Sequence, residues 1–114
     1  MLTIDSLKAF GADTDEGLGR CMGSESLYLR LTGIVLQDQG FEKLQKAVEE
    51  NDLDAAFEAA HALKGALGNL SLTPIYKPVC DITELLRSRT ETDYAPLVAQ
   101  ILEGRDRLKE LAEG

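Results

Sequence analysis

Apolar residues recur three and four positions apart along this chain, and no segment sustains an alternation of apolar and polar residues. The first pattern places apolar residues on one face of an α-helix, whereas the second would indicate a half-buried strand. The longest periodic segment runs from Ser24 to Asn51. Its apolar positions are Leu27, Leu31, Ile34, Phe41, Leu44 and Val48. Gly33 and Gly40 lie inside it without changing the phase of this stripe, so the pattern predicts one long helix.

Shorter segments with the same periodicity lie on both sides of the long one. The predicted helices are Thr3–Phe10, Asp13–Met22, Leu53–Leu70, one that starts between Pro74 and Pro78 and ends at Arg89, and a last one that opens at Pro96. An irregular start is expected because Pro78 lacks the N–H that an established helix would use. We therefore predict an all-α fold over residues 1–114. It is a single helical domain, an antiparallel four-helix bundle with short N-terminal helices.

The charge and the chain ends limit the classes of function. A formal net charge of −8 argues against nucleic-acid binding, because contact with phosphate backbones needs a surplus of Lys and Arg. The chain shows no signal-peptide pattern and no apolar run of membrane-spanning length. We expect a cytoplasmic protein without a membrane segment, and the initial methionine favours a free-standing one. Cys21 and Cys80 would be reduced there and are expected to be small core residues.

The only histidine of the chain, His61, lies in the helix predicted over residues 53–70. When this helix is projected at about 100° per residue, its alanines and leucines gather on one face. These predicted core residues are Ala56, Ala60, Leu63, Leu67 and Leu70. His61 lies about 140° from the centre of that face, so its imidazole is expected to point outward and to be accessible.

Four other residues of interest share the outward half of this helix with His61: Phe57, Lys64, Gly65 and Gly68. A lone exposed histidine or lysine is most often only a solvated side chain. The two glycines add weight, since each lowers helix stability by about 1 kcal/mol relative to alanine. They either permit close packing against a neighbouring helix or clear space around the imidazole for another protein. Phe57 fits equally well at the edge of the core or in a docking surface.

An exposed imidazole followed by a lysine one turn later suits phosphoryl transfer. A neutral imidazole nitrogen is nucleophilic near neutral pH, and Lys64 could offset charge on the phosphoryl oxygens. The chain has no ATP-binding loop, no pair of aspartates for Mg²⁺ and no second histidine. We therefore expect a carrier that depends on a partner's active site, with no cofactor or metal of its own.

The residues around His61 resemble the signature of histidine-containing phosphotransfer (HPt) domains, with the string His61-x-Leu63-Lys64-Gly65-Ala66-x-Gly68-Asn69-Leu70. The resemblance extends to the chain length and the order of helices. It implies a four-helix bundle in which His61 is phosphorylated, Lys64 assists the phosphoryl group, and Gly65 and Gly68 let a receiver domain approach. The chain departs from the usual pattern of these domains at Ser71, where they often have glycine, and at Pro74 and Pro78.

The resemblance implies a phosphorelay carrier in two-component signal transduction. His61 would accept a phosphoryl group from a receiver-domain aspartyl phosphate or a histidine kinase and pass it to another receiver aspartate. The receiver would supply Mg²⁺. The alternative is a helical interaction module, a decayed HPt domain that docks a receiver or kinase without phosphotransfer. A metal- or haem-binding bundle fits poorly, because one histidine and scattered carboxylates supply no Glu-x-x-His ligand set.

Overall fold

Seven α-helices make up the regular structure of residues 1–113, which are the residues that the computed structural model describes. No strand occurs among these residues. In chain order the helices are α1 (Ile4–Phe10), α2 (Thr14–Arg20), α3 (Glu25–Leu36), α4 (Gly40–Glu49), α5 (Leu53–Asn69), α6 (Thr73–Arg87) and α7 (Ala95–Glu113).

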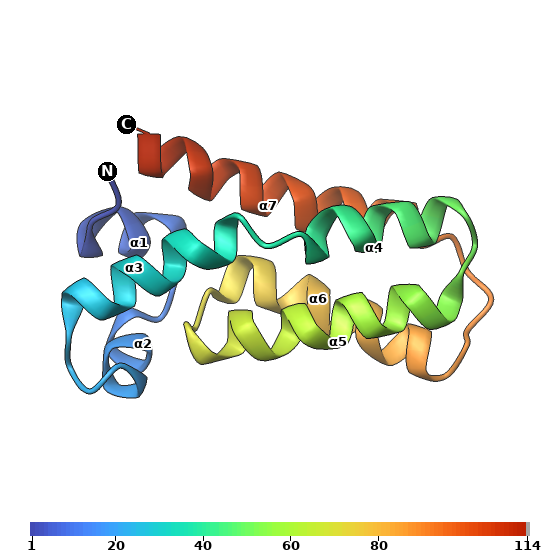
Figure 1. Cartoon of the computed structure of the whole chain (residues 1–114), viewed down its shortest axis with the longest axis horizontal. Helices are drawn as coiled ribbons and strands as arrows, with labels where there is room; N and C mark the ends of the chain where they lie inside the picture. The colour runs from blue at the N-terminus through green and yellow to red at the C-terminus, as the bar shows by residue number, and fades with distance from the viewer. Residues whose placement is uncertain (114) are drawn as a thin grey trace.

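The last four helices form the bundle, and Figure 1 shows that each runs opposite to the one before it. Helix α5 packs against α4 and α6, and α7 closes the bundle by packing against α6 and α4. Each helix contributes fully buried aliphatic side chains to the core between them, among them Leu44, Leu63, Leu67, Ile82 and Ile101. The prediction of an all-α, antiparallel four-helix bundle with short N-terminal helices is confirmed.

The short helices α1 and α2 lie at the end of the molecule where α7 finishes (Figure 1). Helix α1 ends at Phe10 and is capped by Gly11, whose φ of +106° favours glycine. Helix α2 begins after Asp13 and ends at Arg20, two residues before the predicted end. Both cysteines are free, and Cys21 is buried as expected, whereas Cys80 is only half-buried.

The segment predicted as one helix over 24–51 is two helices, so this prediction is wrong. Helix α3 ends at Leu36 and α4 begins at Gly40. The Asp38 side chain accepts a hydrogen bond from the Gly40 N–H at 2.6 Å. A Cβ at position 40 would lie 2.8 Å from the Asp38 carboxylate and 3.1 Å from Cγ of Leu63 on α5. The glycine therefore permits a close approach of two helices and does not continue one.

The break also changes which residues of α3 are buried. Ile34, which the periodicity places in the core stripe, is 61% exposed. The buried residues of α3 are instead Tyr28, Thr32, Val35 and Leu36. On α4, Phe41 and Leu44 are buried as predicted. The two helices have different neighbours, because α3 packs against α2 and α7 whereas α4 packs against α5 and α7. One continuous stripe therefore does not describe both.

Helix α6 begins before both of its prolines, so the predicted start between them is wrong. It begins at Thr73, with Pro74 in the first turn and Pro78 inside the helix. The missing N–H of Pro78 deprives one carbonyl, that of Pro74, of its usual donor. Pro78 is buried in the bundle, and burial of its ring offsets part of this loss.

Tyr28 and the turn between α5 and α6 connect the N-terminal helices to the bundle. Tyr28 is fully buried, and its hydroxyl donates a hydrogen bond to the Leu70 carbonyl at 2.7 Å. Burial raises the pKa of Tyr28 to about 12, which keeps the phenol a neutral donor. The Asp13 N–H donates to the Ser71 carbonyl at 3.0 Å. These contacts hold α2 and α3 beside the residues that directly follow α5.

Candidate functional site

Helix α5 has one buried and one exposed face, as its sequence predicts. Its buried residues are Ala56, Ala60, Leu63 and Leu67. His61 lies on the exposed face. The helix begins after Asp52, whose side chain accepts a hydrogen bond from the Ala55 N–H at 3.1 Å. His61 is therefore presented to solvent from the middle of a capped helix of 17 residues, away from ends that fray.

Phe57 lies one turn before His61 and contacts its imidazole. The two ring centroids are 5.6 Å apart and the rings meet edge to face at 72°. Arg87 of α6 lies over the phenyl ring, with its Cζ 5.6 Å from the ring centroid. Phe57 is half-buried and packs against the core. These contacts favour the edge-of-core interpretation of Phe57 and give it a part in orienting the histidine ring.

Lys64 lies one turn after His61 and leans toward α6. Its Nζ is 4.0 Å from Oε1 of Glu84, and the same oxygen pairs with Arg87 at 2.6 Å. The Glu84 side chain is 58% exposed. A long ion pair to an exposed carboxylate adds little stability. Glu84 therefore holds the Lys64 ammonium only weakly.

The two glycines that follow His61 have different surroundings. A Cβ at Gly65 would meet no atom within 4 Å, so this position is open to solvent. A Cβ at Gly68 would lie 2.9 Å from Cε1 of Tyr76, a residue of α6. Gly68 therefore serves close packing between α5 and α6, which is one of the two interpretations left open by the sequence. Gly65 alone leaves unoccupied space beside the imidazole.

One shallow depression in the surface contains most of the predicted site. It is lined by His61, Lys64, Gly65, Gly68 and Asn69, all from α5. Phe57 lines a separate depression on the other side of the imidazole, together with Arg87. The structure thus brings together four of the five site residues predicted from the sequence, with the fifth in contact with His61.

Two residues from other helices also line this depression, Arg20 of α2 and Tyr76 of α6. The sequence reasoning missed both. No spacing pattern connects Arg20 with His61, because the two residues lie in separate helices. The only indication of Tyr76 in the sequence is indirect. The ring of Tyr76 leaves no room for a side chain at position 68, and that position is a glycine.

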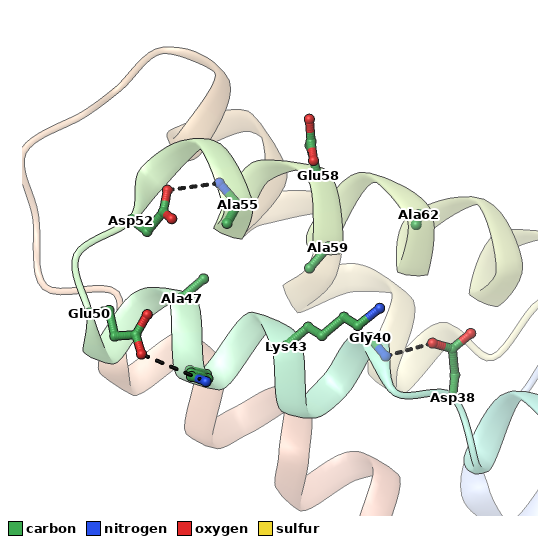
Figure 2. Close-up of a pocket in the computed structure, with 11 residues that line it drawn as sticks. Asp38, Gly40, Lys43, Ala47, Glu50, Asp52, Ala55, Glu58, Ala59 and Ala62 are labelled. Carbon is green, nitrogen blue, oxygen red and sulfur yellow. Dashed lines mark hydrogen bonds and ion pairs between the residues drawn. The ribbon is translucent and has the colours of Figure 1, made fainter.

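A third depression lies between α4 and α5 (Figure 2). Ala55, Ala59 and Ala62 form its α5 wall, and Ala62 directly follows His61. Charged side chains of both signs lie along its edges: Asp38, Lys43, Lys46, Glu50, Asp52 and Glu58. Figure 2 shows the three short alanine side chains on the α5 side of this depression, with Glu58 pointing away from α4. Small side chains therefore flank the histidine on the α4 side.

Within residues 1–113, no group of three or more His, Cys, Asp and Glu side chains is arranged to hold a metal ion. Across the same residues, no helix has both the length and the apolar character needed to cross a membrane.

A family model described as the Hpt domain matches residues 37–113. This match covers well over half of the chain, and the protein belongs to the Hpt domain family. Membership identifies a phosphotransfer carrier of two-component signalling, from a family that interacts with receiver domains and kinases. No curated protein and no solved structure matches the chain. The family match spans α4–α7 and leaves α1–α3 outside it.

Proposed function

We propose that His61 is the phosphoryl acceptor of a phosphorelay carrier. It takes the group from a receiver-domain aspartyl phosphate or a histidine kinase and passes it to another receiver aspartate. The observation that carries this proposal is the position of His61, the chain's single histidine, on the exposed face of α5 beside Lys64. The carrier works in the cytoplasm as one domain over residues 1–114.

The chemistry needs only one lone pair from this chain. An unprotonated ring nitrogen of His61 attacks the phosphorus of the aspartyl phosphate. An N–P bond forms, the P–O bond to the aspartate breaks, and its electron pair returns to the carboxylate. The proton on the other ring nitrogen can then leave to solvent. Onward transfer reverses these steps with a second receiver aspartate as the nucleophile.

The partner completes the active site in this proposal. Mg²⁺ belongs to the receiver domain, and the carrier binds no metal or cofactor. Lys64 neutralises charge on the phosphoryl oxygens during transfer and in the product. Gly65 leaves open space beside the imidazole for the receiver, Gly68 lets α6 pack closely at the edge of the same surface, and Phe57 borders the contact area. The carrier does not catalyse the transfer alone.

The direct test is to incubate the protein with a phosphorylated receiver domain and Mg²⁺ and to assay for acid-labile phosphohistidine. We expect rapid labelling of the wild type. A protein that binds the receiver but takes up no label would support the alternative, a decayed HPt domain that docks without phosphotransfer. This result would contradict the proposed carrier function.

Lys64→Ala is expected to slow phosphoryl transfer roughly tenfold, because it removes a cation that stabilises negative charge on the phosphoryl oxygens in the transition state. The effect is limited to this size because Lys64 is partly exposed, and solvent weakens the interaction of an exposed cation. Its fold should persist, since Lys64 makes only the long pair with Glu84. Rapid-quench labelling measures the rate, and circular dichroism measures the helix content. Lys46→Ala, a change of an exposed lysine on α4, is the matched control. A large loss of helicity in Lys64→Ala would contradict the outward placement.

Gly65→Gln is expected to block the receiver without disturbing the fold. The position has no neighbour within 4 Å, so a long side chain fits the free protein but occupies the space beside the imidazole. Labelling from a phosphorylated receiver should fall at least about tenfold, while labelling by phosphoramidate, a small donor, should change little. Gly33→Gln on α3, where a Cβ is equally free, controls for the substitution itself. Equal receiver kinetics in both variants would argue against docking over Gly65.

A further inference from the structure

Arg20 is the one cation that a helix outside the family match contributes to the depression at His61. It is the last residue of α2, and it lines this depression together with Lys64. Its side chain is half-exposed, so the guanidinium is open to solvent and to ligands. The surface around the imidazole therefore holds two positive charges from two different helices.

A series of contacts holds Arg20 in place. Its Nη2 donates to Oε1 of Glu16 at 3.2 Å, and the same oxygen accepts a hydrogen bond from the Ser71 hydroxyl at 2.8 Å. Ser71 lies in the turn that directly follows the histidine helix. The Ser71 carbonyl also accepts the Asp13 N–H that opens α2. The first turn of α2 is thus tied to the turn that follows the histidine helix, and Arg20 is linked to that turn through Glu16.

Ser71, which contacts Glu16, has an unusual backbone conformation. Its φ is +52°, in the left-handed region where glycine is favoured over residues with a side chain. The serine nevertheless uses its hydroxyl to reach Glu16. The side chain at this strained position therefore has a partner on α2, and that partner is the residue that holds Arg20.

We propose that Arg20 is a phosphoryl-binding residue, a second cation that α2 supplies to the phosphoryl group on His61. This inference rests on the proposed function of His61. A guanidinium offers several N–H donors in one plane and can bind two phosphoryl oxygens at once, which an ammonium such as Lys64 cannot match in geometry. Glu16 and Glu84 lie close to the two cations and repel the incoming group. Both carboxylates are more than half exposed, so solvent weakens this repulsion.

The ion pair with Glu16 fixes where the Arg20 guanidinium lies before His61 is phosphorylated. In the unphosphorylated protein the guanidinium is neutralised by an exposed carboxylate. A phosphoryl group on His61 carries up to two negative charges and competes for the same donors. Because the pair with Glu16 is exposed and weak, exchange toward the phosphoryl group needs only a rotation of a solvent-exposed side chain.

The test measures the phosphorylated histidine itself and uses no partner protein. The full chain is labelled with phosphoramidate, and ³¹P NMR follows the second ionisation of the phosphoryl group. Arg20→Ala should raise the pKa of that phosphoryl group by about half a unit, because a nearby cation favours the dianion. It should also change the rate of phosphohistidine hydrolysis by about three- to fivefold. Arg20→Lys should restore part of the pKa shift. Arg30→Ala, an exposed arginine on α3, should change neither quantity.

The outcomes separate the two proposals. If the wild type forms no phosphohistidine with either phosphoramidate or a phosphorylated receiver as the donor, both the proposed function and this inference are overturned. If the wild type is labelled but Arg20→Ala matches Arg30→Ala in phosphoryl pKa and hydrolysis rate, only the role of Arg20 is overturned. A raised phosphoryl pKa in Arg20→Ala with partial recovery in Arg20→Lys supports it, since a residue that only stabilises the fold would not move this ionisation.

Discussion

His61→Gln is expected to abolish acid-labile phosphorylation completely while the protein folds as the wild type does. The imidazole supplies the only nucleophilic ring nitrogens in the chain, since there is no other histidine. The side chain is exposed and contributes little to the core, so glutamine, a good helix former, should leave the free energy of unfolding within about 0.5 kcal/mol of the wild-type value.

The experiment compares label from a phosphorylated receiver, before and after mild acid, with thermal unfolding of the same samples. Glu58→Gln, an exposed substitution on α5 outside the histidine depression, is the matched control and should label normally. Acid-labile label that persists in His61→Gln would place the acceptor elsewhere. Loss of label together with loss of the folded state would mean that the histidine has a structural role, against its exposed position.

The division of α5 into two faces could be predicted from the sequence because one helix contains all the information needed. Its alanines and leucines repeat with the helical period, and that period fixes where His61 points relative to the core. The structure confirms the buried residues Ala56, Ala60, Leu63 and Leu67. It also confirms the exposure of His61. No contact with another helix was needed for this inference.

The break between α3 and α4 could not be read in the same way. It depends on contacts between segments that are distant in sequence, such as the approach of Gly40 to Leu63. The stripe through Leu31, Ile34 and Phe41 kept its phase by coincidence, and Ile34 is exposed. Pro78 illustrates a similar limit, because its cost to a helix is local whereas the burial that offsets it comes from the whole bundle.

The candidate site shows the same contrast. Lys64 and Gly65 follow His61 on one helix, so their spacing alone brings them together. Arg20 and Tyr76 reach the same depression from α2 and α6. Their placement depends on how three helices pack, and no pattern along the chain encodes it. The same limit applies to Gly68, whose neighbour Tyr76 is visible only in the structure.

Gly17→Ala is expected to destabilise the protein by about 1–3 kcal/mol, the typical cost of forcing an extra carbon into a packed site. A Cβ at this position would lie 2.5 Å from the hydroxyl oxygen of Tyr28 and 2.8 Å from its Cε1. The ring cannot easily retreat, because Tyr28 is fully buried and its hydroxyl donates to the Leu70 carbonyl. Gly19→Ala in the same helix meets no atom within 4 Å and should stabilise by about 0.5–1 kcal/mol.

Urea unfolding of the two alanine variants separates the contact from the general effect of adding alanine to α2. Opposite signs are expected, and equal midpoints would contradict the close approach of α2 to Tyr28. Combining Gly17→Ala with Tyr28→Phe should cost less than the sum of the single changes. Phenylalanine lacks the hydroxyl oxygen, which is one of the three Tyr28 atoms that the added Cβ would meet, and it lacks the hydrogen bond to Leu70 that holds the ring in place. This coupling would show that the helix carrying Arg20 packs directly against Tyr28, whose hydroxyl is bonded to the residue that follows α5.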